Sequence, residues 1–310
     1  MKKEKIYKIF TGAKMDKNQK KGSLLLLLTA LIWGLAFVAQ SEGMKHVGPF
    51  TYQASRMLLG ALALIITIKI SDSKKKKSGT YEKMSPESSK ILVRSGIICG
   101  IALFVASSLQ QCGIQYTTVG KAGFITALYI LFVPVIGIFL KKRMSAKKWL
   151  CVAVAILGLF FLCVTENFTF TKGDILVLLC SVSFAVHILI IDKFAPQIDG
   201  VRLSCMQFLV CGLISLAVMF IFETPRISSI TSAWISILYS GVLSCGVGYT
   251  LQIIGQKDTA PALASLLMSF ESVFAVIFGI LLLKQVPTPR EILGCALMFA
   301  AIVAAQRLPD

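Results

Sequence analysis

The chain has 310 residues, of which 56% are hydrophobic and 15% are charged. A soluble domain has about a quarter of its residues charged, so this composition excludes the soluble globular and the disordered classes. An integral membrane protein remains. Ten spans of about 20 residues would take up about 200 residues. The rest of the chain is then needed for ends and connections, which leaves no room for a soluble domain.

Apolar stretches of spanning length recur along the whole chain. The first one follows a basic segment, as in a signal peptide, but it reaches spanning length and has no evident small-residue cleavage site, so we interpret it as a retained helix. We therefore predict an all-α polytopic membrane protein with ten transmembrane helices. They are expected near residues 22–40, 50–70, 91–114, 119–140, 148–164, 173–191, 203–222, 233–254, 261–283 and 290–306.

The positive charge is distributed unevenly between the two sides of these spans. The formal net charge is +17, which by itself could suggest binding to nucleic acid. However, when residues at the span edges are counted with the connecting segments, 25 of the 31 Lys and Arg residues fall in the odd-numbered segments, and no aromatic or Gly residues are interleaved with the lysines. The positive-inside rule then predicts a multi-pass protein of the cell membrane with both termini in the cytoplasm. The lysines are expected to contact lipid head groups and no nucleic acid.

The sequence resembles itself at two offsets. A shift of 151 residues aligns the first two spans with the sixth and seventh, and a shift of 142 aligns the third and fourth with the eighth and ninth. The informative matches are Gly22 with Gly173, Gln110 with Gln252, Gly113 with Gly255, Thr117 with Thr259, and Tyr129 with Glu271.

These offsets predict three parts: a basic cytoplasmic segment (1–21), a first five-helix repeat (22–165) and a second five-helix repeat (173–306). Because five is odd, the second repeat must enter the membrane from the opposite side. Inverted repeats of this kind recur in secondary transporters, where they supply the outward-open and inward-open states.

Small residues at every fourth position mark close helix contacts, because they let two backbones approach each other in lipid. The stripe in the tenth span could serve a homodimer or an intramolecular contact. Pro134 in the fourth span leaves a backbone carbonyl unpaired, which predicts a kink there. The stripes are Gly96 and Gly100, then Ser236, Ser240, Ser244 and Gly248, and finally Ala296, Ala300 and Ala304.

Three ionisable residues lie at membrane depth, where such residues are costly and usually functional: Arg56, His187 and Glu271. Glu271 could carry a proton linked to substrate occupancy, or it could make a structural hydrogen bond to Ser269, Ser272 or a helix end. Arg56 could hold a carboxylate of the substrate. Bracing through a permanent ion pair is the favoured interpretation of Arg56, because Arg keeps its charge. His187 is the weaker candidate.

Polar and aromatic residues in the third, fourth, eighth and ninth spans predict a central amphipathic cavity that binds a small amphipathic solute. No C-x-x-C occurs among the nine cysteines, and the two histidines are far apart, so no metal or other cofactor is expected. The candidate substrate-binding residues are Trp33, Gln110, Phe124, Tyr129, Tyr249 and Gln252.

Other membrane functions lack their usual motifs. The sequence has no H-E-x-x-H, no paired intramembrane aspartates and no G-x-S-x-G, so we predict no catalytic residue and no enzyme. It also lacks G-x-x-x-x-G-K-[ST], which disfavours an ATP-driven pump, and no charged ring or filter motif of a channel is visible.

From about Gly22 to Gln306 the chain resembles the EamA family of the drug/metabolite transporter superfamily. The matching segments, in order, are 31–37 (L-I-W-G-L-A-F), Arg56 with the Leu/Ala-rich helix after it, 124–126 (F-I-T) leading to 133–135 (V-P-V), 248–256, 260–262 (A-P-A) and 270–275 (F-E-S-V-F-A). Two positions depart from the family pattern, because Ser272 stands where a proline is usual and Gln285 where an acidic residue is usual.

This resemblance implies two inverted five-helix repeats, alternating access, and a central cavity lined mostly by helices one, three, four, six, eight and nine. It also implies the movement of small metabolites or drugs, often outward, by proton coupling or exchange. A flippase for lipid-linked sugars, known elsewhere in the superfamily, is the alternative, and an intramembrane enzyme is the less favoured one.

Overall fold

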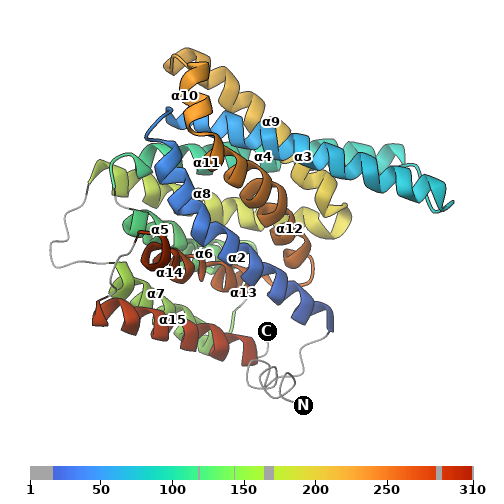
Figure 1. The fold of residues 1–310 in the computed structure, drawn as a ribbon. Helices are drawn as coiled ribbons and strands as arrows, with labels where there is room; N and C mark the ends of the chain where they lie inside the picture. Colours follow the sequence, from blue (N-terminus) through green and yellow to red (C-terminus); the bar gives the residue numbers. More distant parts are fainter. Residues whose placement is uncertain (1–16, 118, 143, 164–170, 284–287, 309–310) are drawn as a thin grey trace.

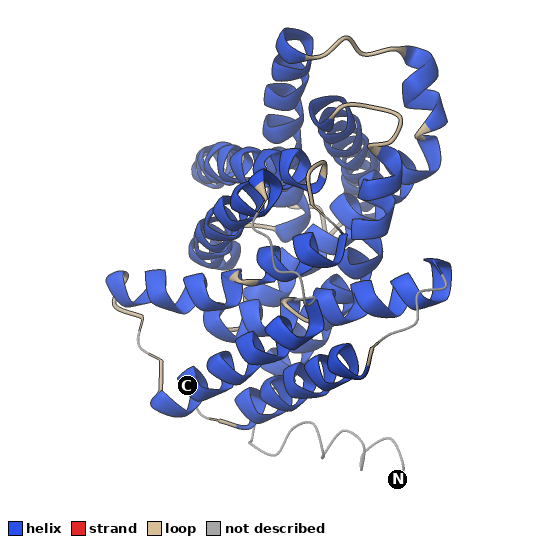
Figure 2. Ribbon diagram, turned by 90° about the vertical axis from the view of Figure 1, so that its left-hand side faces the viewer, coloured by secondary structure: helices blue, strands red, loops and turns tan. Residues whose placement is uncertain are grey.

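The computed structural model describes residues 17–117, 119–142, 144–163, 171–283 and 288–308. Within these ranges all regular secondary structure is helical (Figures 1 and 2). Because the bilayer core offers no water, each spanning segment must satisfy its backbone groups internally, and a helix does so. The prediction of an all-helical polytopic protein is confirmed.

The helices follow the predicted apolar stretches in order. The first half contains α2 (Lys17–Gly43), α3 (Pro49–Lys77), α4 (Pro86–Ile114), α5 (Val119–Ala127), α6 (Tyr129–Phe139) and α7 (Ala146–Cys163). The second half contains α8 (Lys172–Phe194), η1 (Ala195–Gln197), α9 (Gly200–Phe222), α10 (Ile227–Ser232), α11 (Trp234–Leu238), η2 (Tyr239–Tyr249), α12 (Thr250–Gln256), α13 (Pro261–Met268), α14 (Glu271–Leu283) and α15 (Pro289–Arg307).

Each of the ten predicted stretches contains helix. Among the described residues, eight helical segments are long and apolar enough to cross a membrane, and Ile292–Ala305 is a shorter apolar helix. The short helices η1 and α10 were not predicted. α3 and α4 extend together beyond the rest of the bundle (Figure 1). Of the basic segment 1–21, only 17–21 are described, and they form the start of α2.

Polar side chains fix several helix starts. Thr171 and Asp174 form a reciprocal capping box at the start of α8. The carboxylate of Glu223, just after α9, accepts hydrogen bonds from the backbone N–H groups of Phe50 and Thr51, both at 2.8 Å. Glu223 therefore ties the start of α3 to the end of α9 and satisfies two donors that α3 leaves open.

The fourth span of each half is broken. α5 ends at Ala127 and α6 begins at Tyr129, while α13 ends at Met268 and α14 begins at Glu271. The first break precedes Pro134, which lies inside α6, so the discontinuity falls closer to the middle of the span than the proline alone predicts. In both halves the polar residue Tyr129 or Glu271 directly follows the break.

The eighth span is wider than an α-helix in its middle. η2 is a π-helix from Tyr239 to Tyr249, a rare geometry that often occurs at functional sites. An α-helical pitch would place Cys245 on the same face as Tyr249 and Gln252. In the π-helix the thiol of Cys245 lies against Met57, with 3.8 Å between the two sulfur atoms.

Small residues mark the closest helix contacts. An ideal Cβ built on Gly96 would lie 2.5 Å from the Cβ of Met206 in α9, and the two backbones are therefore close together. α7 and α15 lie side by side (Figure 1), with Gly158 against the carbonyl of Gly294. The α15 face that contacts α7 is thus not the predicted stripe, whose members Ala296, Ala300 and Ala304 are exposed.

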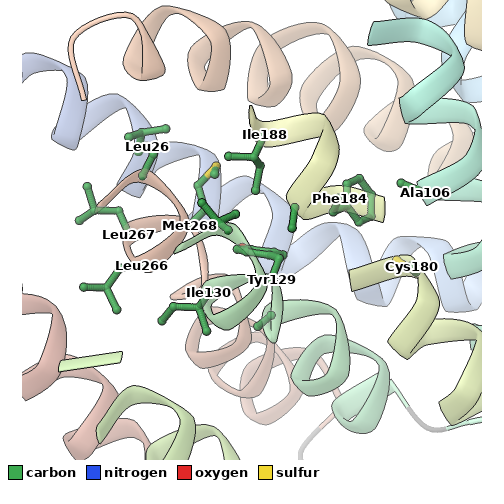
Figure 3. Packing of buried hydrophobic residues seen from close by; sticks show 14 of the residues in the cluster. Leu26, Ala106, Tyr129, Ile130, Cys180, Phe184, Ile188, Leu266, Leu267 and Met268 are labelled. Carbon is green, nitrogen blue, oxygen red and sulfur yellow. The ribbon is translucent and has the colours of Figure 1, made fainter. Parts of the chain in front are cut away.

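A continuous apolar core joins the two halves. Ile130, Leu267 and Met268 are fully buried, and Ile188 is 2% exposed. In Figure 3 they lie on neighbouring helices near Tyr129. The core thus surrounds the two broken spans and holds the polar residues that follow the breaks.

Candidate functional site

A pocket lies where helices of both halves meet. Its free volume is about 30 Å³, enough for a water molecule or two, whereas a drug-sized ligand needs about 300 Å³ or more. The pocket of this structure is therefore too small for such a ligand. It is lined by Trp33, Ala36, Phe37, Gln40, Arg56, Gln110, Thr126, Tyr129, Phe184, Ile188, Ser244, Tyr249, Gln252 and Glu271.

Most of the candidate residues taken from the sequence meet in this pocket. The two that do not line it are Phe124, which is 8% exposed and belongs to the apolar core, and His187, which is fully buried behind the wall. The seven that line it are Trp33, Arg56, Gln110, Tyr129, Tyr249, Gln252 and Glu271.

Glu271 pairs with Tyr129 across the halves. The Tyr129 hydroxyl donates a hydrogen bond of 3.0 Å to Glu271 Oε1, and Glu271 is 3% exposed. The serines predicted as structural partners of Glu271 were the wrong ones. Ser269 donates to the carbonyl of Leu266 in the preceding turn, and Ser272 donates to the carbonyl of Gly123, because the break before α14 directs these two hydroxyls to backbone acceptors.

Arg56 lies among uncharged polar groups. Its Nη1 donates to Gln40 Oε1 at 3.0 Å, and Gln111 Nε2 donates to the same oxygen. Arg56 is 2% exposed, and its Nε and Nη2 have no hydrogen-bond partner. Its Cζ lies 5.9 Å from the centre of the Tyr52 ring. The permanent ion pair favoured from the sequence was therefore wrong: among the described residues no carboxylate lies within ion-pair distance of Arg56.

Aromatic rings form one wall of the pocket. The ring centres of Trp33 and Tyr249 are 4.6 Å apart, and Phe208 packs edge-on against Tyr249 at 5.6 Å from behind. His187 also contacts Tyr249, at 6.2 Å, and its Nε2 is 3.1 Å from Gln207 Oε1. His187 therefore supports the wall and does not face the solute space.

The two glutamines expected in the site lie on the remaining side. Gln110 Nε2 is hydrogen-bonded to Thr126 Oγ1 at 3.3 Å. Gln252 is 1% exposed, and its Oε1 has no partner among the described residues. The pocket thus holds an unpaired amide oxygen and an incompletely paired guanidinium group, both buried and both able to bind a solute.

Several pocket residues of the first and sixth spans were missing from the predicted site, although Trp33 and Arg56 were among its candidates. Trp33, Ala36, Phe37 and Gln40 of α2 line the pocket. The offset of 151 residues could have found one partner, because it pairs Trp33 with Phe184. Nothing in the sequence distinguishes Gln40, whose role depends on the side chains that meet it. Gln285 lies outside the described residues.

Comparisons with known proteins agree with this architecture. The EamA-like transporter family matches the chain twice, over residues 20–164 and 171–305. The chain belongs to this family. The family match and the many apolar helices indicate a multi-pass membrane transporter, which confirms that part of the prediction.

Relatives and a solved structure match almost the whole EamA-like chain. An "Uncharacterized transporter" of Archaeoglobus fulgidus is 27% identical over 279 residues, covering 90% of this chain and 83% of the relative. The "Uncharacterized transporter YoaV" of Bacillus subtilis is 25% identical over 289 residues, covering 91% and 95%. A crystal structure with 18% identity covers 92% of this chain and 96% of its own, with a TM-score of 0.74, and thus shares the fold.

Proposed function

We propose that the protein is a secondary active transporter that moves a small amphipathic solute across the cell membrane by alternating access. Its ten spans form two inverted five-helix repeats, and the pocket between them is the solute site. The observation that carries the proposal is that the pocket is lined by residues from matching positions of both halves.

Four pairs of pocket residues are related by the two sequence offsets. Gln110 and Gln252 are separated by 142 positions, as are Tyr129 and Glu271. The offset of 151 relates the other two pairs, Trp33 with Phe184 and Phe37 with Ile188. A pocket built from equivalent positions lies on the axis that relates the two halves. A site on this axis is suited to being exposed to each side of the membrane in turn.

The two halves of the chain also make equivalent helix contacts with each other. α4 packs on α8, and the matching pair, η2 with α12, packs on α2. An ideal Cβ on Gly22 would lie 2.7 Å from the carbonyl oxygen of Gly255, and one on Gly173 would lie 2.6 Å from that of Gly113. These are two versions of one contact, which supports a repeated fold.

Glu271 is the group proposed to couple transport to protons. It is the acidic residue of the pocket wall, and its described partner is the neutral hydroxyl of Tyr129. A buried carboxylate without a cationic partner can change its protonation when a solute enters or leaves. The lysine distribution supports cytoplasmic termini. We propose that the transporter works as an exporter and that it is driven by proton coupling or by exchange.

Metabolite comparison followed by counterflow tests the proposal. Mass spectrometry compares the metabolites of cells that express the protein with those of cells that express a Gln110→Leu, Gln252→Leu variant. The solute whose distribution between cells and medium differs is then loaded into proteoliposomes that contain the protein. We expect unlabelled solute inside the vesicles to accelerate uptake of labelled solute, as a carrier requires. Chemical conversion of the solute, or uptake that is indifferent to the internal pool, would contradict transport by alternating access.

A further inference from the structure

Among the described residues Arg56 has no carboxylate within ion-pair distance, although Glu271 lines the same pocket. The side chain comes from the first turns of α3, lines the pocket and is 2% exposed. Only Nη1 has a hydrogen-bond acceptor, the neutral oxygen of Gln40 at 3.0 Å. A buried guanidinium without a counterion is unfavourable in a membrane protein, so such groups usually meet an anionic partner.

The unpaired atoms of Arg56 form a defined binding edge. Nε and Nη2 lie on the same side of the planar guanidinium group, and neither has a partner. Two parallel N–H groups on this edge match the two oxygens of a carboxylate. The Tyr52 ring centre lies 5.9 Å from Cζ, over a face of the group, so the ring does not supply a partner for the two N–H groups of the edge.

The aromatic wall of the pocket is suited to a flat apolar body. Trp33, Phe37, Phe184 and Tyr249 line it with Arg56, and the Trp33 and Tyr249 rings contact each other with their centres 4.6 Å apart and their planes tilted by 56°. Aromatic walls of this kind bind planar or apolar groups by contact area.

We propose, on the basis of the proposed transport function, that the solute is a small monocarboxylate with a flat apolar body and that Arg56 binds its carboxylate. The structure provides the free guanidinium edge, the absence of a described protein counterion, and the aromatic wall beside it.

Thermal stabilisation of the purified full-length protein, measured in chloride-free buffer, tests this inference. The probes are 3-phenylpropionate, its neutral amide and 3-phenylpropylamine, which share a carbon skeleton and differ in the charged group. Because a ligand that binds the folded state raises its stability, we expect the carboxylate to raise the melting temperature and the amide and the amine to have little effect. Equal stabilisation by the amide or by chloride, stabilisation by the amine, or no response to the carboxylate would overturn the inference.

A substitution beside Arg56 separates binding from folding. Gln40→Glu keeps the size of the side chain and both of its hydrogen-bond donors, Arg56 and Gln111, and it supplies an internal carboxylate. We expect this variant to fold and to bind 3-phenylpropionate at least about tenfold more weakly, the effect of a lost charge-assisted hydrogen bond. Gln115→Glu, at an exposed position, is the matched control. Unchanged binding in Gln40→Glu would contradict the role of Arg56.

The second variant removes the charge of Arg56 itself. Arg56→Gln should lose the preference for the carboxylate over the amide, whereas Arg94→Gln, an equal change at an exposed arginine of α4, should keep it. Failure of this inference differs from failure of the transport proposal. Counterflow of a neutral solute that ignores Arg56 would refute the inference alone, whereas the absence of counterflow for every solute would refute both.

Discussion

The hydroxyl group of Tyr129 donates a hydrogen bond of 3.0 Å to the carboxylate of Glu271, across the two halves of the chain and 142 positions away in the sequence. The same offset relates Gln110 to Gln252. Two equivalent positions of a twofold repeat touch each other only close to the axis that relates them. The contact therefore supports our proposal that the solute site lies on this axis.

The proposed role of Glu271 predicts the behaviour of Glu271→Gln. This variant keeps the size of the side chain and an acceptor for Tyr129, but it cannot release or bind a proton. We expect solute exchange to continue and its response to an imposed pH gradient to disappear in proteoliposomes. Glu42→Gln, at an exposed acid that pairs with Lys45, should respond as the unaltered protein does. A pH response that survives in Glu271→Gln would remove the proton-coupling role.

The glutamines of the pocket predict a loss of transport without a loss of folding. Gln252→Leu removes a buried amide whose oxygen has no partner, so it leaves no protein group unpaired. We expect slower transport of the solute at equal expression and equal or higher thermal stability, because burial of an unpaired polar atom costs about 1–3 kcal/mol. The solute flux of Gln115→Leu, at an exposed end of α4, provides the comparison. A Gln252→Leu variant with normal transport would show that the solute does not contact this amide.

The close contacts at glycines predict that a Gly→Ala substitution, which adds one methyl group, strongly lowers the stability of the protein. In Gly22→Ala the new Cβ would lie 2.6 Å from Thr259 Oγ1 and 2.7 Å from the Gly255 carbonyl, so one of the helices must shift. Overpacking of this kind costs about 1–3 kcal/mol, and Gly173→Ala should behave alike. Gly123→Ala has no atom within 4 Å of the new Cβ and should leave the melting temperature in detergent unchanged or higher. Equal melting temperatures for all three variants would contradict the close contact.

The ion pair between Asp72 and Arg202 predicts a small effect. Arg202 Nη2 is 2.7 Å from Asp72 Oδ1, and both side chains are about a quarter exposed. A partly exposed pair contributes about 1 kcal/mol or less. Asp72→Asn should therefore lower thermal stability slightly at low salt, and the difference should vanish at high salt. We expect the reversed pair, Asp72→Arg with Arg202→Asp, to restore the thermal stability. If the reversed pair does not restore it, the contact is not electrostatic.

Much of the helical fold could be predicted from the sequence, because the hydropathy of a segment reports on whether it can span a bilayer. The spans were found to within a few residues, as in α9, where 203–222 became Gly200–Phe222. The breaks before Tyr129 and Glu271 and the π-helix of the eighth span could not be predicted. They depend on how two helices from different halves meet, and Pro134 gave only an approximate position.

The site was harder to predict than the spans because it depends on which side chains face each other. Glu271 and Arg56 could be selected from the cost of placing a charge in a membrane, but their partners could not. Phe124 was expected at the site, but it belongs to the apolar core and does not line the pocket. Gln40 was missed, because an amide becomes significant only when Arg56 and Gln111 donate to it.

The opposite orientation of the two halves is tested most directly by labelling two corresponding connections. Single cysteines replace Ser78, between α3 and α4, and Ser228, between α9 and α11, in a chain whose own cysteines have been removed; both serines are exposed. A membrane-impermeant maleimide should react with Ser78→Cys only in inside-out vesicles and with Ser228→Cys only in intact cells. Labelling of both cysteines from the same side of the membrane would contradict the inverted repeat and, with it, a shared solute site on its axis.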